Sequence, residues 1–335
     1  MSKNNILITG AEGFIGSHLT ERLVRMGANV KALVLYNSFN KEGWLEDVPK
    51  DIRNNIEIIS GDVRDQELML NISKDVEVFF HLAALISIPY SYNAPRSFLS
   101  TNTIGTLNIL EAAKRTNCKK IIATSTSEVY GTAIKTPIDE LHKIQAQSPY
   151  AASKISADLF LESYVKTYNL PAVILRPFNT FGPRQSERAV ISSIIRQLLD
   201  DKIKSIKIGS LETKRDFNYV QDTVTAFVKL AEASSKKIEY GSAYNAGSGK
   251  AVSIGNILEK VIKLTGSNKK IIQDKSRFRP KESEVHNLIA SSKKFNKLTS
   301  WQPEFSLEKG LKETIDWWES RKNNNKIRLS SNYAI

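Results

Sequence analysis

The chain of 335 residues contains a single cysteine, Cys118, and no long apolar run. One thiol cannot form an internal disulfide, and no cluster of Cys, His and acidic residues has the spacing of metal ligands. The sequence therefore predicts neither a disulfide scaffold nor a metal site. The apolar runs fall far short of the ~18 residues that a membrane-spanning helix needs. Because the N-terminal segment also lacks the apolar stretch of a signal peptide, we expect a cytoplasmic protein with no membrane partner.

Acidic residues are fewer than basic residues. The chain has 48 Lys and Arg against 35 Asp and Glu, a formal net charge of +13. Most of the excess lies in residues 259–297 and in the tail 321–335. Such basic segments suit a nucleic acid, a phosphorylated small molecule or a solvated surface. No zinc-finger spacing, aromatic RNA-binding signature or basic zipper is present, so we expect no nucleic-acid partner.

Short apolar runs alternate with amphipathic stretches through the first half of the chain. Strands are predicted at 5–9, 30–36, 56–60, 76–81, 120–124 and 172–176, and helices at 14–26, 103–115 and 150–168. A loop is expected around Pro89 and Pro95. This alternation, without hairpin signals, predicts an α/β fold with a Rossmann-like, doubly wound parallel sheet covered on both faces.

The pattern becomes mixed after Pro177. Helices are predicted at 191–199, 222–233, 254–264, 293–298 and 307–319, and strands at 204–208 and 242–246. We predict a Rossmann-like domain over residues 1–179, with segments returning to it over about 216–248. A smaller mixed α/β lobe for the substrate follows over 180–320, and a basic, flexible tail over 321–335.

Three glycines stand between the first predicted strand and the first predicted helix, at Gly10, Gly13 and Gly16. Glycine lets the backbone turn tightly and approach a pyrophosphate, and the N-terminus of a helix offers amide donors to it. The alternative is a plain tight turn. The strand–turn–helix setting favours dinucleotide binding.

The acidic residue that binds the adenosine ribose in many such folds is missing at the end of the second strand. Tyr36, Asn37 or Ser38 would have to bind the ribose with neutral groups. No basic residue stands there to hold a 2′-phosphate, which favours NAD over NADP. Asp62 follows the third strand, next to Val63, where its carboxylate can accept from the adenine amino group. Alternatively, Asp62 only caps the next turn.

Two further groups of residues suggest catalysis. Tyr150 and Lys154 are four residues apart on a predicted helix and so share one face. A lysine ammonium near a phenol stabilises the phenolate and prepares the tyrosine to act as a base. Thr126 and Glu128 follow the strand at 120–124, where parallel sheets carry functional groups. The alternative for Tyr150 and Lys154 is an accidental surface pair. The alternative for Thr126 and Glu128 is a hydroxyl-rich turn.

Several motifs in order resemble the extended short-chain dehydrogenase/reductases that act on nucleotide sugars. They are the glycine turn, the segment around Thr126, Tyr150–Lys154, and residues 81–84, 102–106, 176–183, 215–222 and 279–280. The resemblance covers roughly residues 5–318. It implies that Thr126, Tyr150 and Lys154 are the catalytic hydroxyl, base and lysine.

The resemblance also implies the ligands. It places NAD on Gly10, Gly13, Phe14, Ile15, Gly16, Tyr36, Asn37, Asp62, Val63, Leu82, Ala83, Ala84, Asn102, Tyr150 and Lys154. It places the substrate, a nucleotide sugar, on Ser87, Asn179, Val190, Arg215 and Arg279. Arginines suit the dianionic diphosphate because they form bidentate hydrogen bonds. Ordinary helix packing is an equal alternative for Val190. Relatives pair through the helices near 102–115 and 150–168, so a homodimer is expected.

The family includes C4 epimerases, 4,6-dehydratases, decarboxylases and reductases. In similar dehydratases an Asp-Glu pair follows the catalytic threonine, to remove the C5 proton and protonate the C6 hydroxyl. Here these positions hold Ser127 and Glu128. The carboxylate favours elimination, with Glu128 serving both steps and Ser127 orienting O6. A C4 epimerase remains the first alternative, and a non-catalytic NAD- or nucleic-acid-binding protein the second.

Finer details resemble a narrower group, the 4,6-dehydratases of legionaminic acid and related N-acetylamino-sugar pathways. These details are residues 36–40, 43–45, 126–131 and 277–284. The resemblance implies a nucleotide-activated N-acetylglucosamine, with UDP or GDP as the nucleotide.

Overall fold

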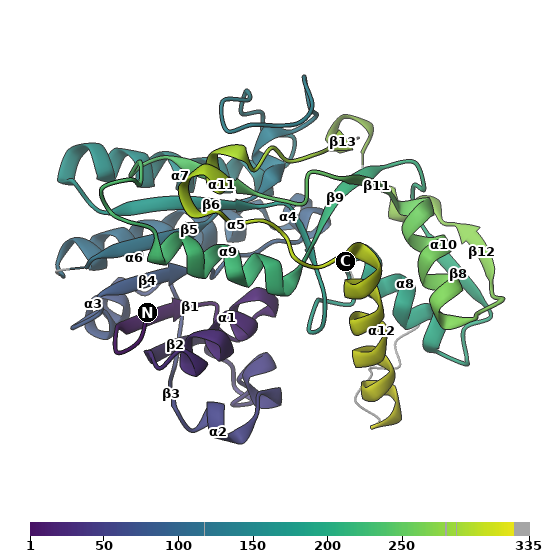
Figure 1. Ribbon diagram of the computed structural model, residues 1–335, viewed down its shortest axis with the longest axis horizontal. Coiled ribbons are helices and arrows are strands. Elements are labelled where there is room, and N and C mark those ends of the chain that lie inside the picture. The colour runs from purple at the N-terminus through teal and green to yellow at the C-terminus, as the bar shows by residue number, and fades with distance from the viewer. Residues whose placement is uncertain (117, 279, 286, 325–335) are drawn as a thin grey trace.

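The computed structural model describes residues 1–116, 118–278, 280–285 and 287–324. Its centre is a seven-stranded sheet in the order β10-β6-β5-β4-β1-β2-β3, in which all neighbours are parallel (Figure 1). The strands are β1 (Asn5–Thr9), β2 (Asn29–Leu35), β3 (Ile56–Gly61), β4 (Val78–His81), β5 (Lys120–Thr124), β6 (Ala172–Pro177) and β10 (Ala243–Ala246). The predicted parallel α/β sheet is confirmed.

Helices cover both faces of this sheet, because alternate side chains of each strand point to opposite sides. Ile6 and Ile8 of β1 belong to the larger core cluster, and Leu7 between them belongs to the other. On the larger side lie α1 (Phe14–Arg25) and α9 (Val220–Glu232). On the other lie α3 (Gln66–Ile72), α6 (Gly105–Lys114) and α7 (Pro149–Tyr168).

The second half of the chain adds two small sheets. The strand β9 (Lys214–Tyr219) pairs with β7 (Asn179–Phe181), β11 (Ala251–Ser253) and β13 (Asn287–Leu288), and β8 (Ser205–Ile208) pairs with β12 (Lys270–Gln273). Around them lie α8 (Val190–Leu199), α10 (Ile254–Thr265), α11 (Lys293–Thr299) and α12 (Leu307–Asn323). Of these strands, only β8 is predicted from the sequence. The others are short or rich in polar residues, so their apolar pattern is weak. β10 joins the large sheet although it comes late in the chain.

Two sequence predictions are corrected in the region before α6. The expected loop around Pro89 and Pro95 consists of two short helices, α4 (Ile88–Asn93) and α5 (Pro95–Phe98). Each proline lies in a first helical turn, where its missing N–H breaks no intrahelical bond. The helix expected from Thr103 begins earlier, as a π-helical segment η2 (Leu99–Ile104) that continues into α6.

The remaining short helices are η1 (Gly43–Asp47), α2 (Lys50–Arg53), η3 (Ser127–Tyr130), η4 (Lys275–Arg277) and η5 (Lys281–Ser283). The expected tail from residue 321 is also corrected, because α12 continues to Asn323. Arg321 and Lys322 lie in its last turn and pair with Asp47 and Asp201. Residues 325–335 lie outside the described residues. No helix in the described part of the chain is long and apolar enough to cross a membrane.

Candidate active site

The strand order of the large sheet reverses between β1 and β4. From β1 the chain adds β2 and β3 on one side, and then β4, β5 and β6 on the other. Ligands of open α/β sheets bind in the crevice at the carboxyl ends of the strands at such a reversal. The glycine turn, residues 10–16, follows β1, and Leu82–Ala84 follow β4. Two of the segments predicted to bind the cofactor therefore flank one crevice.

The glycine turn has no room for side chains at two positions. Gly10 has a φ of +69°, and a Cβ there would lie 2.7 Å from the backbone nitrogen of Ala83. A Cβ on Gly16 would lie 2.1 Å from the carbonyl oxygen of Gly10. Gly13 is the N-cap of α1, and no side chain of the described residues caps that end. The first-turn amides can therefore receive an anionic group.

The end of β2 is held by Glu12, which the sequence motifs did not indicate as a site residue. The N–H of Leu35 donates to Oε1 of Glu12, in the glycine turn, at 3.0 Å. Burial raises the pKa of Glu12. Tyr36 is 70% exposed at the mouth of this region. The side chain of Asn37 bonds the backbone of its own loop, at Leu35 and Lys41.

Asp62, predicted to contact adenine, is engaged with its own turn. Its carboxylate accepts the backbone N–H of Arg64 at 2.9 Å and pairs with the guanidinium at 2.6 Å. The hydrogen bonds with Arg64 lower the pKa of Asp62. The turn-capping alternative therefore describes the geometry here, and a contact with adenine remains a prediction.

A buried chain of hydrogen bonds joins the ends of β1 and β4 to η2. The Thr9 hydroxyl lies 2.8 Å from Nδ1 of His81, and Nε2 of His81 lies 3.0 Å from the Thr106 hydroxyl. That hydroxyl donates to the carbonyl oxygen of Asn102 at 2.6 Å. Burial lowers the pKa of His81 to about 3, so the ring is neutral. Because Thr106 uses its proton on Asn102, we assign the ring proton to Nε2.

Asn102 itself is fully buried. Its side chain accepts from the N–H of Leu85 at 2.8 Å and donates to the carbonyl oxygen of Leu85 and to the Ser153 hydroxyl, each at 2.9 Å. Asn102 thereby holds the segment after β4 against α7, and its role in binding NAD remains a prediction.

The predicted catalytic pair lies at the start of α7. This helix begins where it does because Ser148 caps it and Pro149 occupies its first turn. Tyr150 and Lys154 are 7% and 4% exposed. Nζ of Lys154 donates to the carbonyl oxygen of Thr124 at 2.6 Å, at the end of β5. Burial lowers the pKa of Lys154, because desolvation disfavours the charged ammonium.

Thr126 and Glu128, in the segment that follows β5, act on Tyr150. Burial raises the pKa of the Tyr150 phenol, a hydrogen bond with Thr126 opposes this, and the charge of Glu128 adds to the increase. Oγ1 of Thr126 also accepts the N–H of Glu128 at 3.2 Å. Ser127 between them is 3% exposed. The structure thus brings together the predicted Thr126, Ser127, Glu128, Tyr150 and Lys154.

A buried ion pair that no sequence motif indicated supports this group. The Asp158 carboxylate, one helical turn beyond Lys154, accepts from the Ser125 hydroxyl at 2.8 Å. The guanidinium of Arg176 pairs with the same carboxylate at 2.9 Å and donates to the Tyr130 hydroxyl, also at 2.9 Å. The pair therefore ties α7 to the ends of β5 and β6.

The predicted substrate residues lie on several elements. Arg215, in β9, is 6% exposed, and its guanidinium pairs with Glu284 at 3.2 Å. Asn179, in the adjacent β7, has a buried Oδ1 with no partner among the described residues. Ser87 is the N-cap residue of α4, and Val190 begins α8 and packs partly on the core. Arg279 lies outside the described residues.

No group of three or more His, Cys, Asp and Glu side chains that could hold a metal ion occurs in the described ranges. Cys118, the only thiol, is partly buried, and burial raises its pKa to about 11. Such a thiol is a weak nucleophile at neutral pH.

The doubly wound sheet and its glycine turn define a dinucleotide-binding fold. Residues 7–314 match the model of the family described as GDP-mannose 4,6 dehydratase. The chain belongs to this family of nucleotide-sugar dehydratases and epimerases.

Relatives of both reaction types are similar over nearly the whole chain. The dTDP-D-glucose 4,6-dehydratase of Mus musculus is 31% identical over 95% of this chain and 89% of its own. A second relative is the UDP-N-acetylglucosamine 4-epimerase from Methanobrevibacter ruminantium, whose structure is a complex with UDP-N-acetylmuramic acid. That structure has a TM-score of 0.86 and 33% identity, and the match covers 96% of this chain and 100% of the epimerase chain. The structure of the dTDP-glucose 4,6-dehydratase from Bacillus anthracis, in complex with NAD, has a TM-score of 0.82 and 28% identity, covering 96% and 98%.

Proposed function

We propose that this protein is an NAD-dependent 4,6-dehydratase of a nucleotide-activated N-acetylglucosamine. The observation that carries the proposal is the position of Glu128. Its backbone is bonded to Thr126, and its charge acts on the Tyr150 phenol. A carboxylate beside the tyrosine that would take the O4 proton during oxidation of C4 is well placed to remove a proton from C5. A C4 epimerase has no need of such a base.

The glycine turn fits NAD. Gly10 and Gly16 let the backbone of the turn pack where a Cβ would clash, and the amides at the start of α1 have no side-chain cap and are available to an anion. The end of β2 carries no basic side chain to receive a 2′-phosphate, which supports NAD over NADP. When bound, NAD supplies the acceptor for the C4 hydride and later its donor. The NAD complex of the Bacillus anthracis relative supports the same assignment.

The side chains of the site then divide the proton transfers. Tyr150 takes the proton from O4 of the sugar, and Thr126 orients that oxygen. The Lys154 ammonium stabilises the phenolate. The resulting 4-keto group acidifies the C5 proton, which Glu128 removes and passes to the C6 hydroxyl, so that water leaves. Return of the hydride to C6 and of a proton to C5 completes a net loss of one water.

The substrate side supports a nucleoside diphosphate. Arg215 offers a guanidinium for the diphosphate, and the neighbouring Asn179 has a buried oxygen free to accept from a sugar or ribose hydroxyl. We place Arg279, Ser87 and Val190 in the same site on the family resemblance. The N-acetylglucosamine assignment rests on that resemblance too.

A C4 epimerase is the second candidate, and Ser127 favours it. Similar dehydratases have an aspartate there, and this chain has only a hydroxyl. The 33% identical UDP-N-acetylglucosamine 4-epimerase supports the same alternative.

Incubation with four donors separates the two reactions. The full chain is supplied with UDP-GlcNAc, GDP-GlcNAc, UDP-glucose or dTDP-glucose, with and without NAD, in H₂O and in D₂O. A dehydratase removes one water, and its product carries one solvent deuterium at C5. An epimerase gives an isomer of unchanged mass without deuterium. The isomer would refute the role of Glu128, and no reaction with any donor would reject both candidates for these substrates.

The substitution Glu128→Gln tests the base directly. It should abolish water loss while leaving C4 oxidation, seen as NADH absorbance. The matched control is Glu162→Gln, which removes a carboxylate from the exposed side of α7, where Glu162 pairs with Lys166. If the Glu128 variant still dehydrates at the rate of the control, the proposed role is wrong.

We further propose a homodimer through η2 and α7. Leu99 is 52% exposed, and Leu159 and Phe160 are 56% and 39% exposed, which is unfavourable for an unpartnered surface. Phe160→Glu should convert dimers into monomers in light scattering with the fold retained. A wild-type monomer would refute the proposal.

A further inference from the structure

We infer that the last two turns of α12 position the loop at the adenosine end of the cofactor site, with Trp317 and Arg321 as positioning residues. The inference rests on the proposed binding of NAD at the glycine turn. The loop in question, residues 36–47, runs from the end of β2 through η1. No motif in the sequence connected it with the C-terminal helix.

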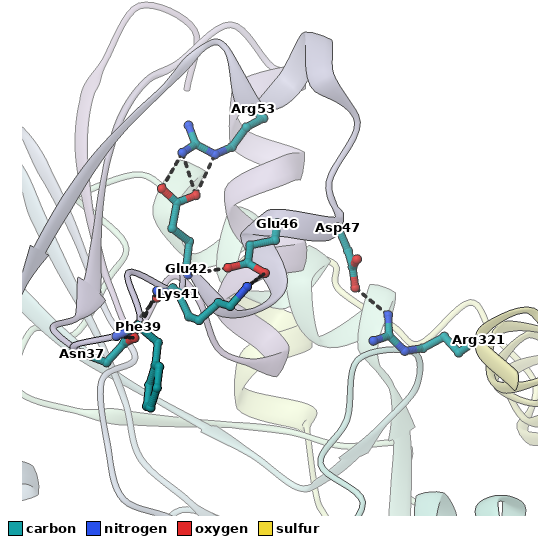
Figure 2. A network of polar contacts seen from close by, with 8 residues as sticks. All are labelled: Asn37, Phe39, Lys41, Glu42, Glu46, Asp47, Arg53 and Arg321. Atoms are coloured by element: carbon teal, nitrogen blue, oxygen red, sulfur yellow. Dashed lines mark hydrogen bonds and ion pairs between the residues drawn. The ribbon is translucent and has the colours of Figure 1, made fainter. Parts of the chain in front are cut away.

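Arg321 joins the helix to the loop in two ways. Its guanidinium pairs with Asp47 at 2.6 Å, as Figure 2 shows. The same group lies over the rings of Trp44 and Trp317, 4.8 and 5.1 Å from their centroids. The two indoles also contact each other edge to face, at 5.5 Å. A guanidinium between two aromatic rings adds cation–π attraction to the ion pair.

Trp44 transmits this contact to the glycine turn. Its backbone N–H donates to the carbonyl oxygen of Glu12 at 3.0 Å. Gly43 packs so closely on Glu12 that a Cβ would lie 2.8 Å from the same oxygen. Glu12 in turn accepts the N–H of Leu35 through its side chain at 3.0 Å. The glycine turn, the end of β2 and η1 thus form one connected unit, which α12 supports from outside.

The rest of the loop is held by its own polar contacts. Oδ1 of Asn37 accepts the N–H groups of Phe39 and Lys41, and Glu42 binds Arg53 of α2 through both oxygens (Figure 2). These bonds set the shape of the loop. Phe39 remains 82% exposed, so apolar burial does little to hold the tip. Apart from the buried Leu45, the loop depends for its position on these polar contacts and on its contacts with α12.

The other end of α12 is anchored on the substrate side. The Tyr219 hydroxyl, at the end of β9, donates to Glu313 at 2.6 Å. Gly310 lies against Phe181 of β7, where a Cβ would be 2.8 Å from the ring. One rigid helix therefore connects the strands that carry Asn179 and Arg215 with the loop beside the glycine turn.

The test measures how fast the cofactor leaves. Full-length protein is loaded with NADH, and an excess of NAD displaces it while NADH fluorescence is followed. Arg321→Ala should release NADH about tenfold faster, which corresponds to ~1.4 kcal/mol. Arg321→Lys can keep the ion pair but not the planar stacking, so its rate of NADH release should lie between those of the wild type and of Arg321→Ala. Trp317→Leu should also speed release.

Lys322→Ala is the matched control. It removes the same charge from the same helical turn, but its partner, Asp201, is 85% exposed and follows α8 rather than belonging to the loop. This variant should release NADH at the wild-type rate. The affinity for UDP and the melting temperature are measured for every variant.

Faster release in the Arg321 variant, with UDP affinity unchanged, supports the inference. Release within twofold of wild type would overturn it, as would an equal weakening of NADH and UDP binding with a lower melting temperature. Failure of the wild-type protein to bind NADH would instead refute the proposed function.

Discussion

Lowering the pH from about 7.5 to about 5 should destabilise this protein, with His81 as one main cause. Burial lowers the pKa of His81 from an ordinary 6.5 to about 3, and that of His18 to about 4. In the unfolded chain both rings take up protons below about pH 6.5. The unfolded state then binds more protons than the folded state. The stabilisation is therefore complete above pH 6.5 and is lost as the pH falls toward the folded values.

The size of the destabilisation follows from the shifts in the histidine pKa values. At pH 5 the unfolded chain lies about 1.5 pH units below its histidine pKa, and each unit contributes ~1.4 kcal/mol, so each buried ring costs about 2 kcal/mol. The two histidines together lower the free energy of unfolding by roughly 4 kcal/mol. Buried carboxyl groups such as Glu12 and Asp216, whose pKa values burial raises, act in the opposite direction.

A comparison of variants isolates His81 from these groups. Urea unfolding is followed by circular dichroism at both pH values for wild type and His81→Asn. The amide can accept from Thr9 and donate toward Thr106, but it does not titrate. The pH-dependent loss should be about 2 kcal/mol smaller in the variant, whatever its stability at pH 7.5. An equal loss in both proteins would refute the assignment of a neutral, buried His81.

Two other substitutions test the site. Gly16→Ala should abolish NAD binding, because its Cβ would lie 2.1 Å from the Gly10 carbonyl oxygen, whereas Gly266→Ala, where no described atom lies within 4 Å, should keep NAD and lose only ~1 kcal/mol of stability. Cofactor content after gel filtration checks this, and normal NAD content in the Gly16 variant would contradict it. Asp158→Asn should cost ~3–5 kcal/mol in urea unfolding, because it leaves the Arg176 guanidinium buried without its charged partner. A loss below about 1 kcal/mol would show that the pair is not effectively buried.

The buried histidines connect stability with the organisation of the site. His81 joins Thr9 to Thr106 within the large sheet region. His18, in α1, lies 3.0 Å from the carbonyl oxygen of Pro183, beyond β7. Protonation would place an uncompensated charge on either buried ring, and both rings lie between elements that approach the cofactor site. We therefore expect NAD retention to fall together with stability below about pH 6.

The sequence alone was sufficient for features that depend on local spacing. Strands and helices of the large sheet follow from apolar runs and 3.6-residue periodicity, and the glycine turn from its place between strand and helix. The four-residue separation of Tyr150 and Lys154 determined that they share a helical face. These features depend on residues that are close in sequence, so they can be predicted without knowledge of the tertiary contacts.

Only the tertiary structure decided what these elements meet. The contact of Thr126 with Tyr150, the pair of Asp158 with Arg176 and the contacts of Arg321 with Asp47 and Trp44 join residues from separate elements. Such contacts depend on the order of strands in the sheet and on the packing of helices against it. The enclosed position of Asn102 is decided in the same way, by the helices and the segment that surround it. Burial in turn sets the pKa values of His81 and Tyr150, because desolvation depends on everything packed around a group rather than on its neighbours in sequence.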